Sequence, residues 1–190
     1  MDSKAASREE IISKFHDGQT IAIGGQTSRR MPERLIGCIL ESGAKHLTIY
    51  CIDTGIPGAG VGRLIDAGVV DHLITTHVGT NPVTNAQIQA GTLTVEFSPM
   101  GSWIERIRCG GMGLGGVLTK TGLGTVVEEG KQIITINGEQ YLLETALRAD
   151  IPITRGIPPA LNIRSLASMP TAVAPTPMKP FSVWKRVPLS

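Results

Sequence analysis

Short apolar runs alternate with amphipathic segments of helical spacing through the first hundred residues, and this alternation constrains the fold more than any other feature of the chain. The apolar runs lie at 20–23, 47–51, 70–75 and 92–97, and the helical segments lie between them, at 32–42, 61–67 and 84–90. A strand followed by a helix and a further strand is the βαβ unit, whose strands are parallel. The sequence therefore predicts an α/β fold with a mostly parallel sheet and flanking helices.

A different pattern follows near residue 130. Two runs rich in β-forming residues, at 131–136 and 139–143, are joined by Asn137-Gly138. Asn-Gly between two such runs favours a type I′ turn and hence a β-hairpin. We therefore expect antiparallel strands beside the parallel ones, in a mixed sheet with a late β-hairpin.

The chain has 190 residues, of which 41% are hydrophobic and 18% charged, so it is long enough for one domain with a substantial core. Residues 1–150 contain thirteen basic and sixteen acidic residues, whereas the last forty contain five basic and no acidic residues. Eight prolines lie from position 152 onward, and proline interrupts helices and central strands. We predict a folded domain over 1–156 and a poorly ordered, proline-rich tail over 157–190.

Charge, cysteine and histidine content narrow the function class. The net charge of +2 is too small to predict nucleic-acid binding, and no run of about 18 apolar residues predicts a membrane span. The three cysteines are widely spaced and the four histidines lack ligand spacing, so we expect no metal site and no disulfide framework. Free thiols and a polar N-terminus predict a cytoplasmic protein.

One candidate binding segment begins at Gly24-Gly25, which follows the first predicted strand and precedes Pro32, a residue suited to the first turn of a helix. Exposed backbone N–H groups near the start of a helix attract anions. A glycine pair is a weak signal by itself, because a tight turn between a strand and a helix explains it equally well.

A second candidate segment contains seven glycines between 110 and 124, and we expect it to form neither a helix nor a stable strand. It could hold a phosphate chain or a pantetheine arm, or it could pack as a loop against a partner protein. Gly111, Gly113 and Gly116 formally match Gly-x-Gly-x-x-Gly. No strand precedes them at the required place and the acidic residue on a following strand is missing, so a dinucleotide-binding unit is not predicted.

Together these segments resemble the α subunit of family I coenzyme A transferases, and in particular its acetate/acetoacetate branch. The first matching motif comprises Asp17-Gly18, the run from Ile21 to Gly25, and Pro32. Further matching segments lie at 77–82, 104–111, 122–125 and 128–131, and the order and spacing agree over residues 8 to about 155. The segment His-Val-Gly-Thr-Asn-Pro at 77–82 is more similar to the acetate branch than to the succinyl/3-oxoadipate branch.

The resemblance implies covalent catalysis. A glutamate of a partner β subunit attacks an acyl-CoA and carries CoA as a glutamyl thioester until a second carboxylic acid takes it over. No stretch here resembles the motif of that glutamate, and Glu105, Glu128 and Glu129 fall within α-subunit motifs, so we expect no catalytic residue in this chain. The implied partners are the β subunit, acyl-CoA and short carboxylic acids, with coenzyme A as a substrate and no permanently bound cofactor.

The resemblance places CoA contacts in the loop after the first strand. The candidate binding residues are Gly24, Gly25, Gln26, Thr27, Ser28, Arg29 and Arg30. In the family this loop is small and uncharged, with phenylalanine at the position of Gln26 and glycine at that of Arg30. Either Arg29 and Arg30 contact the CoA phosphates, or the bulky Arg30 side chain obstructs a close approach that glycine would permit.

Two other departures from the family pattern remove polar side chains. Cys51-Ile52-Asp53 stands where the branch has asparagine before the aspartate, and Pro99-Met100-Gly101 carries methionine where glutamine is usual.

Two alternative functions stay open. A truncated, catalytically inactive relative would keep the fold as a binding or interaction protein. The tail, which lacks the family's later strands and resembles either out-of-frame translation or an acquired extension, favours this reading; the intact segment from Arg106 to Gly130 favours an active subunit. A sugar-phosphate isomerase or effector-binding domain of related architecture would rest on fold similarity alone.

Overall fold

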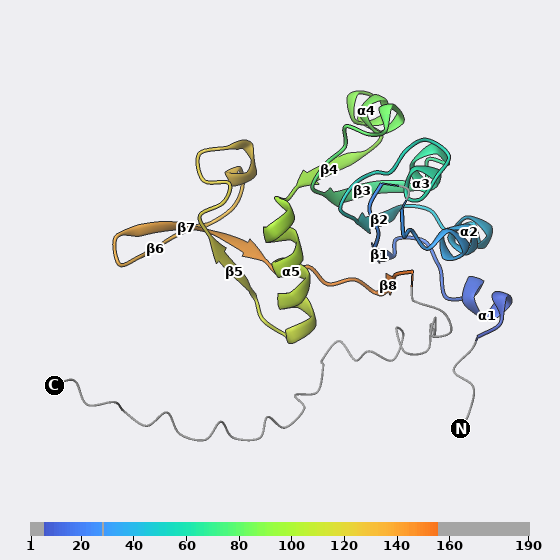
Figure 1. The fold of residues 1–190 in the computed structure, drawn as a ribbon, viewed down its shortest axis with the longest axis horizontal. Helices are drawn as coiled ribbons and strands as arrows, with labels where there is room; N and C mark the ends of the chain where they lie inside the picture. Colours follow the sequence, from blue (N-terminus) through green and yellow to red (C-terminus); the bar gives the residue numbers. More distant parts are fainter. Residues whose placement is uncertain (1–5, 28, 156–190) are drawn as a thin grey trace, which may run out of the picture.

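A parallel five-stranded sheet forms the centre of the computed structural model, which describes residues 6–27 and 29–155 (Figure 1). Its strands are β1 (Thr20–Ile23), β2 (Leu47–Tyr50), β3 (Val70–Thr75), β4 (Thr94–Phe97) and β8 (Ile151–Ile153), in the spatial order β4-β3-β2-β1-β8. Every neighbouring pair is parallel. The predicted α/β class and the predicted strands before residue 100 are therefore confirmed.

Five α-helices accompany the parallel strands. They are α1 (Arg8–Ile12), α2 (Glu33–Ser42), α3 (Gly62–Asp66), α4 (Pro82–Gln89) and α5 (Met100–Met112), of which α2, α3 and α4 connect successive strands, α1 precedes β1 and α5 follows β4. The Asn81 side chain accepts a hydrogen bond from the Val83 N–H and so caps α4, with Pro82 at the first helical position. Gly43 ends α2 with a φ of 75°, the left-handed conformation that glycine adopts without strain.

Successive residues of each strand face opposite sides of the sheet, and each side is covered by different helices. Ile49 and Leu73 belong to the larger hydrophobic core, which they share with residues of α2 and α3. Their neighbours Tyr50 and Ile74 belong to a smaller cluster with Trp103 of α5. Thus α5 packs against the face opposite to α2 and α3, as Figure 1 also shows.

The antiparallel strands form a sheet of their own. It contains β5 (Gly116–Thr119), β6 (Ile133–Ile136) and β7 (Glu139–Thr145) in the order β5-β7-β6, with the short 3-10 helix η1 (Val126–Glu128) between β5 and β6. The predicted hairpin is confirmed, with φ of 52° at Asn137 and 81° at Gly138. Parallel and antiparallel strands do not share one mixed sheet, because α5 lies between the two sheets (Figure 1).

The prediction that the glycine-rich segment lacks regular structure is wrong at two places. Helix α5 continues through Gly110 and Gly111, and β5 begins at Gly116. A Cβ on Gly110 would collide with the Leu147 carbonyl oxygen, and one on Gly116 would collide with the Glu144 carbonyl oxygen. These two glycines therefore allow α5 and β5 to approach the backbone of β7 and the segment after it.

Two expectations about particular regions have different outcomes. The sequence around Trp103, Ile104 and Ile107 predicts that all three lie on the buried face of one helix, but Ile104 is exposed. The tail predicted for 157–190 lies outside the described residues. Among the described helices, none is both long enough and apolar enough to cross a membrane.

Candidate functional site

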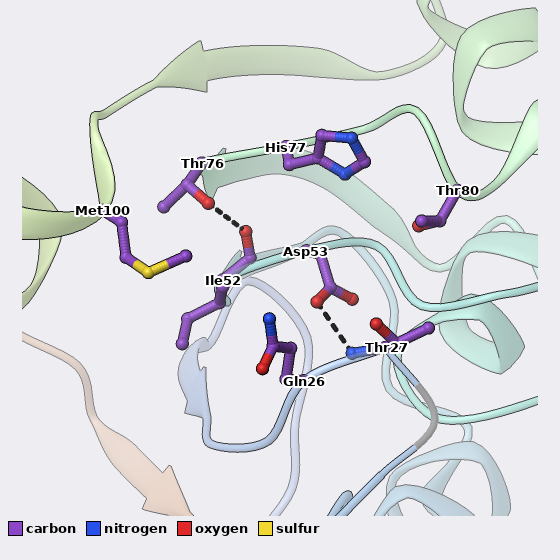
Figure 2. A pocket seen from close by; sticks show the side chains of 8 residues that line it. All are labelled: Gln26, Thr27, Ile52, Asp53, Thr76, His77, Thr80 and Met100. Atoms are coloured by element: carbon purple, nitrogen blue, oxygen red, sulfur yellow. Dashed lines mark hydrogen bonds between the residues drawn. The ribbon is translucent and has the colours of Figure 1, made fainter.

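A cleft of about 480 Å³ opens at the carboxyl ends of the parallel strands (Figure 2). Its walls come from the loops that follow four of these strands and comprise Gln26, Thr27, Ile52, Asp53, Thr76, His77, Thr80 and Met100. In open α/β sheets ligands bind outside the carboxyl ends of the strands, where the loops after the strands converge. The cleft therefore lies where the fold class predicts a binding site.

Asp53 joins two of these loops. Its side chain is 4% exposed, and its oxygens accept hydrogen bonds from the Thr27 N–H at 2.7 Å and the Gly55 N–H at 2.8 Å. A buried carboxylate that accepts two backbone N–H groups is satisfied and held in place. Asp53 thus fixes the loop after β1 against the loop after β2.

The loop after β3 supplies a more varied set of polar groups. The Thr76 hydroxyl donates to the Ile52 carbonyl at 2.7 Å, so it is already used. The Thr80 Oγ1 atom is buried and has no hydrogen-bond partner among the described residues. The His77 side chain lies above Gly79, where an added Cβ would come within 2.9 Å of Nε2, so glycine at 79 makes room for the imidazole.

The predicted loop from Gly24 to Arg30 borders this cleft. Its two glycines pack against other parts of the chain and do not line the cleft. The Gly24 N–H donates to the Ile153 carbonyl at 2.9 Å. Gly25 has a φ of 133°, and a Cβ there would lie 2.6 Å from the Met31 sulfur. Gln26 and Thr27 are the two predicted site residues that line the cleft.

The remaining predicted residues lie outside the cleft wall or outside the described chain. Backbone hydrogen bonds of 3.0 and 2.8 Å pair Gln26 with Arg29 in a tight turn, and Ser28 within it lies outside the described residues. Arg29 and Arg30 are both exposed. Arg30 has a φ of 58°, so at the position where the family has glycine this chain holds an arginine in the left-handed region.

Six residues that line the cleft were not among the predicted binding residues, namely Ile52, Asp53, Thr76, His77, Thr80 and Met100, although all but Thr76 lie in segments that the family comparison had singled out. Most of them lie just after a predicted parallel strand, and that position was the signal that could have found them. Met100 has a different origin, because it begins α5 after the Ser98-Pro99 turn that follows β4.

A second polar cluster lies between the two sheets. The Glu144 side chain is fully buried, and its carboxylate accepts two hydrogen bonds from Lys131 Nζ, at 2.9 and 3.0 Å. Arg106, 3% exposed, lies with Nε 3.6 Å from the same carboxylate and donates to Glu96 at 2.6 Å and to the Thr145 carbonyl at 2.8 Å. Arg106, in the family-like segment 104–111, thus connects α5 to β7, and Lys131, in the segment 128–131, connects the chain before β6 to β7.

The described residues hold no group of three or more His, Cys, Asp and Glu side chains that could bind a metal ion. All three cysteines are buried and unpaired. Burial raises the pKa of Cys51 to about 12, so its thiol is protonated and a poor nucleophile at neutral pH.

Comparisons with known proteins agree with this architecture. The family model described as "Coenzyme A transferase" matches residues 5–156. The chain is 47% identical to the acetoacetyl-CoA:acetate/butyrate CoA transferase α subunit of Clostridium acetobutylicum, over 82% of this chain and 72% of that protein. It is 46% identical to the acetate CoA-transferase subunit α of Escherichia coli, over 82% of this chain and 70% of that protein.

Solved structures show the same fold at lower sequence identity. An acyl-CoA transferase of E. coli O157:H7, crystallised as a thioester complex with CoA, superposes with a TM-score of 0.71 at 17% identity, over 78% of this chain and 33% of that one. Glutaconate coenzyme A-transferase from Acidaminococcus fermentans gives a TM-score of 0.66 at 19% identity, over 80% of this chain and 56% of that one.

The chain belongs to the coenzyme A transferase family. The predicted resemblance to α subunits of the acetate/acetoacetate type is confirmed by the relatives that it matches.

Proposed function

We propose that the chain is the α subunit of an enzyme that moves CoA between a short-chain acyl-CoA and a carboxylic acid such as acetate or acetoacetate. The observation that carries this proposal is that the cleft has no free carboxylate among its described lining residues. Among its described lining residues the one carboxylate is Asp53, and both of its oxygens already accept backbone hydrogen bonds. This arrangement supports a nucleophile from outside the described residues, and we assign it to a partner β subunit.

The glutamates that the sequence singled out do not supply a nucleophile to the cleft. Glu105 pairs with Arg108 at 3.3 Å on an exposed face of α5. Glu128 accepts a hydrogen bond from the Gly124 N–H at 2.6 Å, in the segment around η1. Glu129 is exposed in the same segment, and none of the three lines the cleft.

The curated relatives are named α subunits, which supports a β subunit as the partner. A glutamate of that subunit would attack the thioester carbonyl of acyl-CoA and form an acyl-glutamyl anhydride with release of the CoA thiolate. The thiolate would return to form the glutamyl thioester and free the first acid, and a second carboxylate would reverse both steps. The present chain would contribute the cleft in which the acyl group is held.

The loop after β1 is the proposed contact region for CoA. Gln26 and Thr27 form one wall of the cleft, and Arg29 and Arg30 are exposed beside it. Guanidinium groups bind phosphates through paired, charge-assisted hydrogen bonds, so these two side chains are suited to the phosphates of CoA outside the cleft.

Reconstitution tests the division of labour. The purified chain is assayed for transfer of CoA from acetoacetyl-CoA to acetate, alone and after mixing with the β subunit of a curated relative. We expect no turnover alone and turnover in the mixture. Loss of turnover when the glutamate of the β subunit is changed to glutamine serves as the control. Turnover by the isolated chain would refute the proposal, whereas a stable complex without turnover would support the inactive relative.

Calorimetric titration with CoA tests the arginines. Arg30→Ala should weaken CoA binding by about 1–3 kcal/mol if the guanidinium donates to a phosphate. Arg34→Ala removes an exposed arginine from α2, away from the cleft, and should leave the affinity unchanged. Tighter binding in the Arg30 variant would instead show that the side chain obstructs CoA.

A further inference from the structure

One side chain in the wall of the cleft can carry a positive charge. The described lining residues include one carboxylate, Asp53, and one imidazole, His77, and the other six are neutral. The acids of the proposed reaction enter as carboxylates, so they bring a negative charge toward a wall that already holds Asp53. Like charges repel unless a cation lies near them, and among the described lining residues His77 can supply that cation.

The imidazole of His77 is exposed and unused. No hydrogen bond or ion pair within the described residues engages either of its ring nitrogens. Two other histidines differ in this respect, because His16 Nδ1 lies 3.0 Å from the Asp17 carbonyl oxygen and His46 Nδ1 lies 2.8 Å from the Asp71 carboxylate. A free ring N–H in the wall of a cleft is available to an acceptor that a ligand brings.

The backbone that carries His77 is held in place although the ring is free. His77 pairs with Asp53 in an isolated parallel bridge, and the Thr75 hydroxyl donates to the His77 carbonyl at 3.4 Å. Gly79 leaves room for the ring, because a Cβ there would lie 2.9 Å from Nε2 and 3.2 Å from Cε1. Figure 2 shows the ring extending from the loop after β3 at the cleft. The loop therefore needs little further ordering to present the imidazole to a ligand.

The other polar side chains of the cleft are less suited to a carboxylate. The Thr76 hydroxyl already donates to the Ile52 carbonyl, and the Thr80 Oγ1 atom is buried away from the open part of the cleft. Gln26 and Thr27 can add neutral donors. A neutral donor holds a carboxylate less strongly than a charged one does.

We propose that His77 binds the carboxylate of the acid that accepts CoA. The proposal rests on the proposed function and assigns the acid-binding side chain of its cleft. One carboxylate oxygen accepts a hydrogen bond from a ring N–H of His77, and the other oxygen stays free to attack the glutamyl thioester. The CoA moiety takes no part in this contact, so binding of the acyl-CoA should not depend on His77.

The kinetic test uses the complex of this chain with the β subunit of a curated relative and varies acetate and acetoacetyl-CoA separately. His77→Gln keeps a neutral donor and removes the charge, so KM for acetate should rise by about tenfold, as for a lost hydrogen bond to a charged group. KM for acetoacetyl-CoA should stay the same. His77→Lys restores a positive charge and should bring KM for acetate back toward its original value.

His46→Gln is the matched control. It makes the same change at an exposed imidazole that precedes β2, at the opposite end of that strand from the cleft, and should leave both KM values unchanged. A KM for acetoacetyl-CoA that rises together with that for acetate would mean that His77 contacts CoA or only shapes its loop, and would overturn the proposal. A KM for acetate in His77→Lys as high as in His77→Gln would do the same.

Proton NMR separates failure of this inference from failure of the proposed function. The imidazole Cε1–H signal that is lost in His77→Gln belongs to His77. Sodium acetate should shift this signal until it saturates, whereas acetamide or the same concentration of sodium chloride should not. If the complex transfers CoA to no acid, this titration of the full chain and of the complex decides the inference, and a signal that acetate does not shift counts against it. Transfer with an unchanged acetate KM in His77→Gln would overturn the inference and leave the function intact.

Discussion

The parallel and antiparallel sheets of this chain are stabilised in different ways. Ile21, Ile49 and Leu73 of the parallel sheet are fully buried in one continuous aliphatic core. The antiparallel sheet buries far less of its surface, and Ile133 and Ile136 of β6 are exposed. Part of its contact with α5 is polar, because Glu144 of β7 lies beside Arg106 of α5. The first sheet therefore depends mainly on apolar area, whereas buried charged groups contribute to holding the second.

Glu144→Ala should give the largest loss of stability. It would remove the carboxylate that Lys131 contacts and leave Arg106 with Glu96 as its acidic partner. Removing one member of a buried ion pair costs about 3–5 kcal/mol when the other charge stays buried. The measurement is the free energy of unfolding from urea denaturation.

Glu139→Ala is the matched control, because Glu139 lies on the same strand but pairs with Lys120 where both side chains are more than half exposed. It should leave the free energy of unfolding unchanged. Equal values for the two variants would show that the cluster at Glu144 does not hold the sheets together.

Truncation of isoleucines compares the two sheets directly. Ile49→Ala in β2 creates a cavity in a fully buried position and should cost about 3 kcal/mol. Ile136→Ala in β6 removes an exposed side chain and should change the free energy of unfolding by less than about 0.5 kcal/mol. A large cost at Ile136 would mean that the antiparallel sheet is covered in solution, for example by a second chain.

The parallel sheet was predictable because its signals are local. Strands β1 to β4 are short apolar runs, and α2 and α4 have caps at Gly43 and Asn81-Pro82. Strand β8 was not predicted, because it is three residues long and contains Pro152. The close approach of α5 and β5 to the chain near residues 144–147 was not predictable, because Gly110 and Gly116 meet that backbone far along the chain. The number of glycines in this segment suggested a flexible loop. In the structure, Gly110 and Gly116 instead allow two parts of the backbone to pack closely.

The site was predictable only in part for the same reason. The family motif after β1 identified Gln26 and Thr27, which line the cleft. Asp53, Thr80 and Met100 reach the cleft from three other loops, and their meeting depends on the strand order β4-β3-β2-β1. That order follows from tertiary packing and has no local signature in the sequence.

The smallest expected change in the free energy of unfolding is at Arg30, in the loop after β1 that borders the cleft. Arg30 has a φ of 58°, a region that costs an L-residue about 1–2 kcal/mol and glycine almost nothing. Arg30→Gly should therefore raise the free energy of unfolding by up to about 1 kcal/mol, after the greater flexibility of glycine in the unfolded chain is allowed for.

Arg29→Gly is the matched control for this last change. Arg29 is exposed like Arg30, and glycine there also adds flexibility to the unfolded chain. It should lower the free energy of unfolding by about 0.5–1 kcal/mol, so the two variants should move in opposite directions in the same denaturation experiment. If both variants are destabilising, the backbone at Arg30 is not strained. The arginine at the family's glycine position then does not lower the stability of the fold.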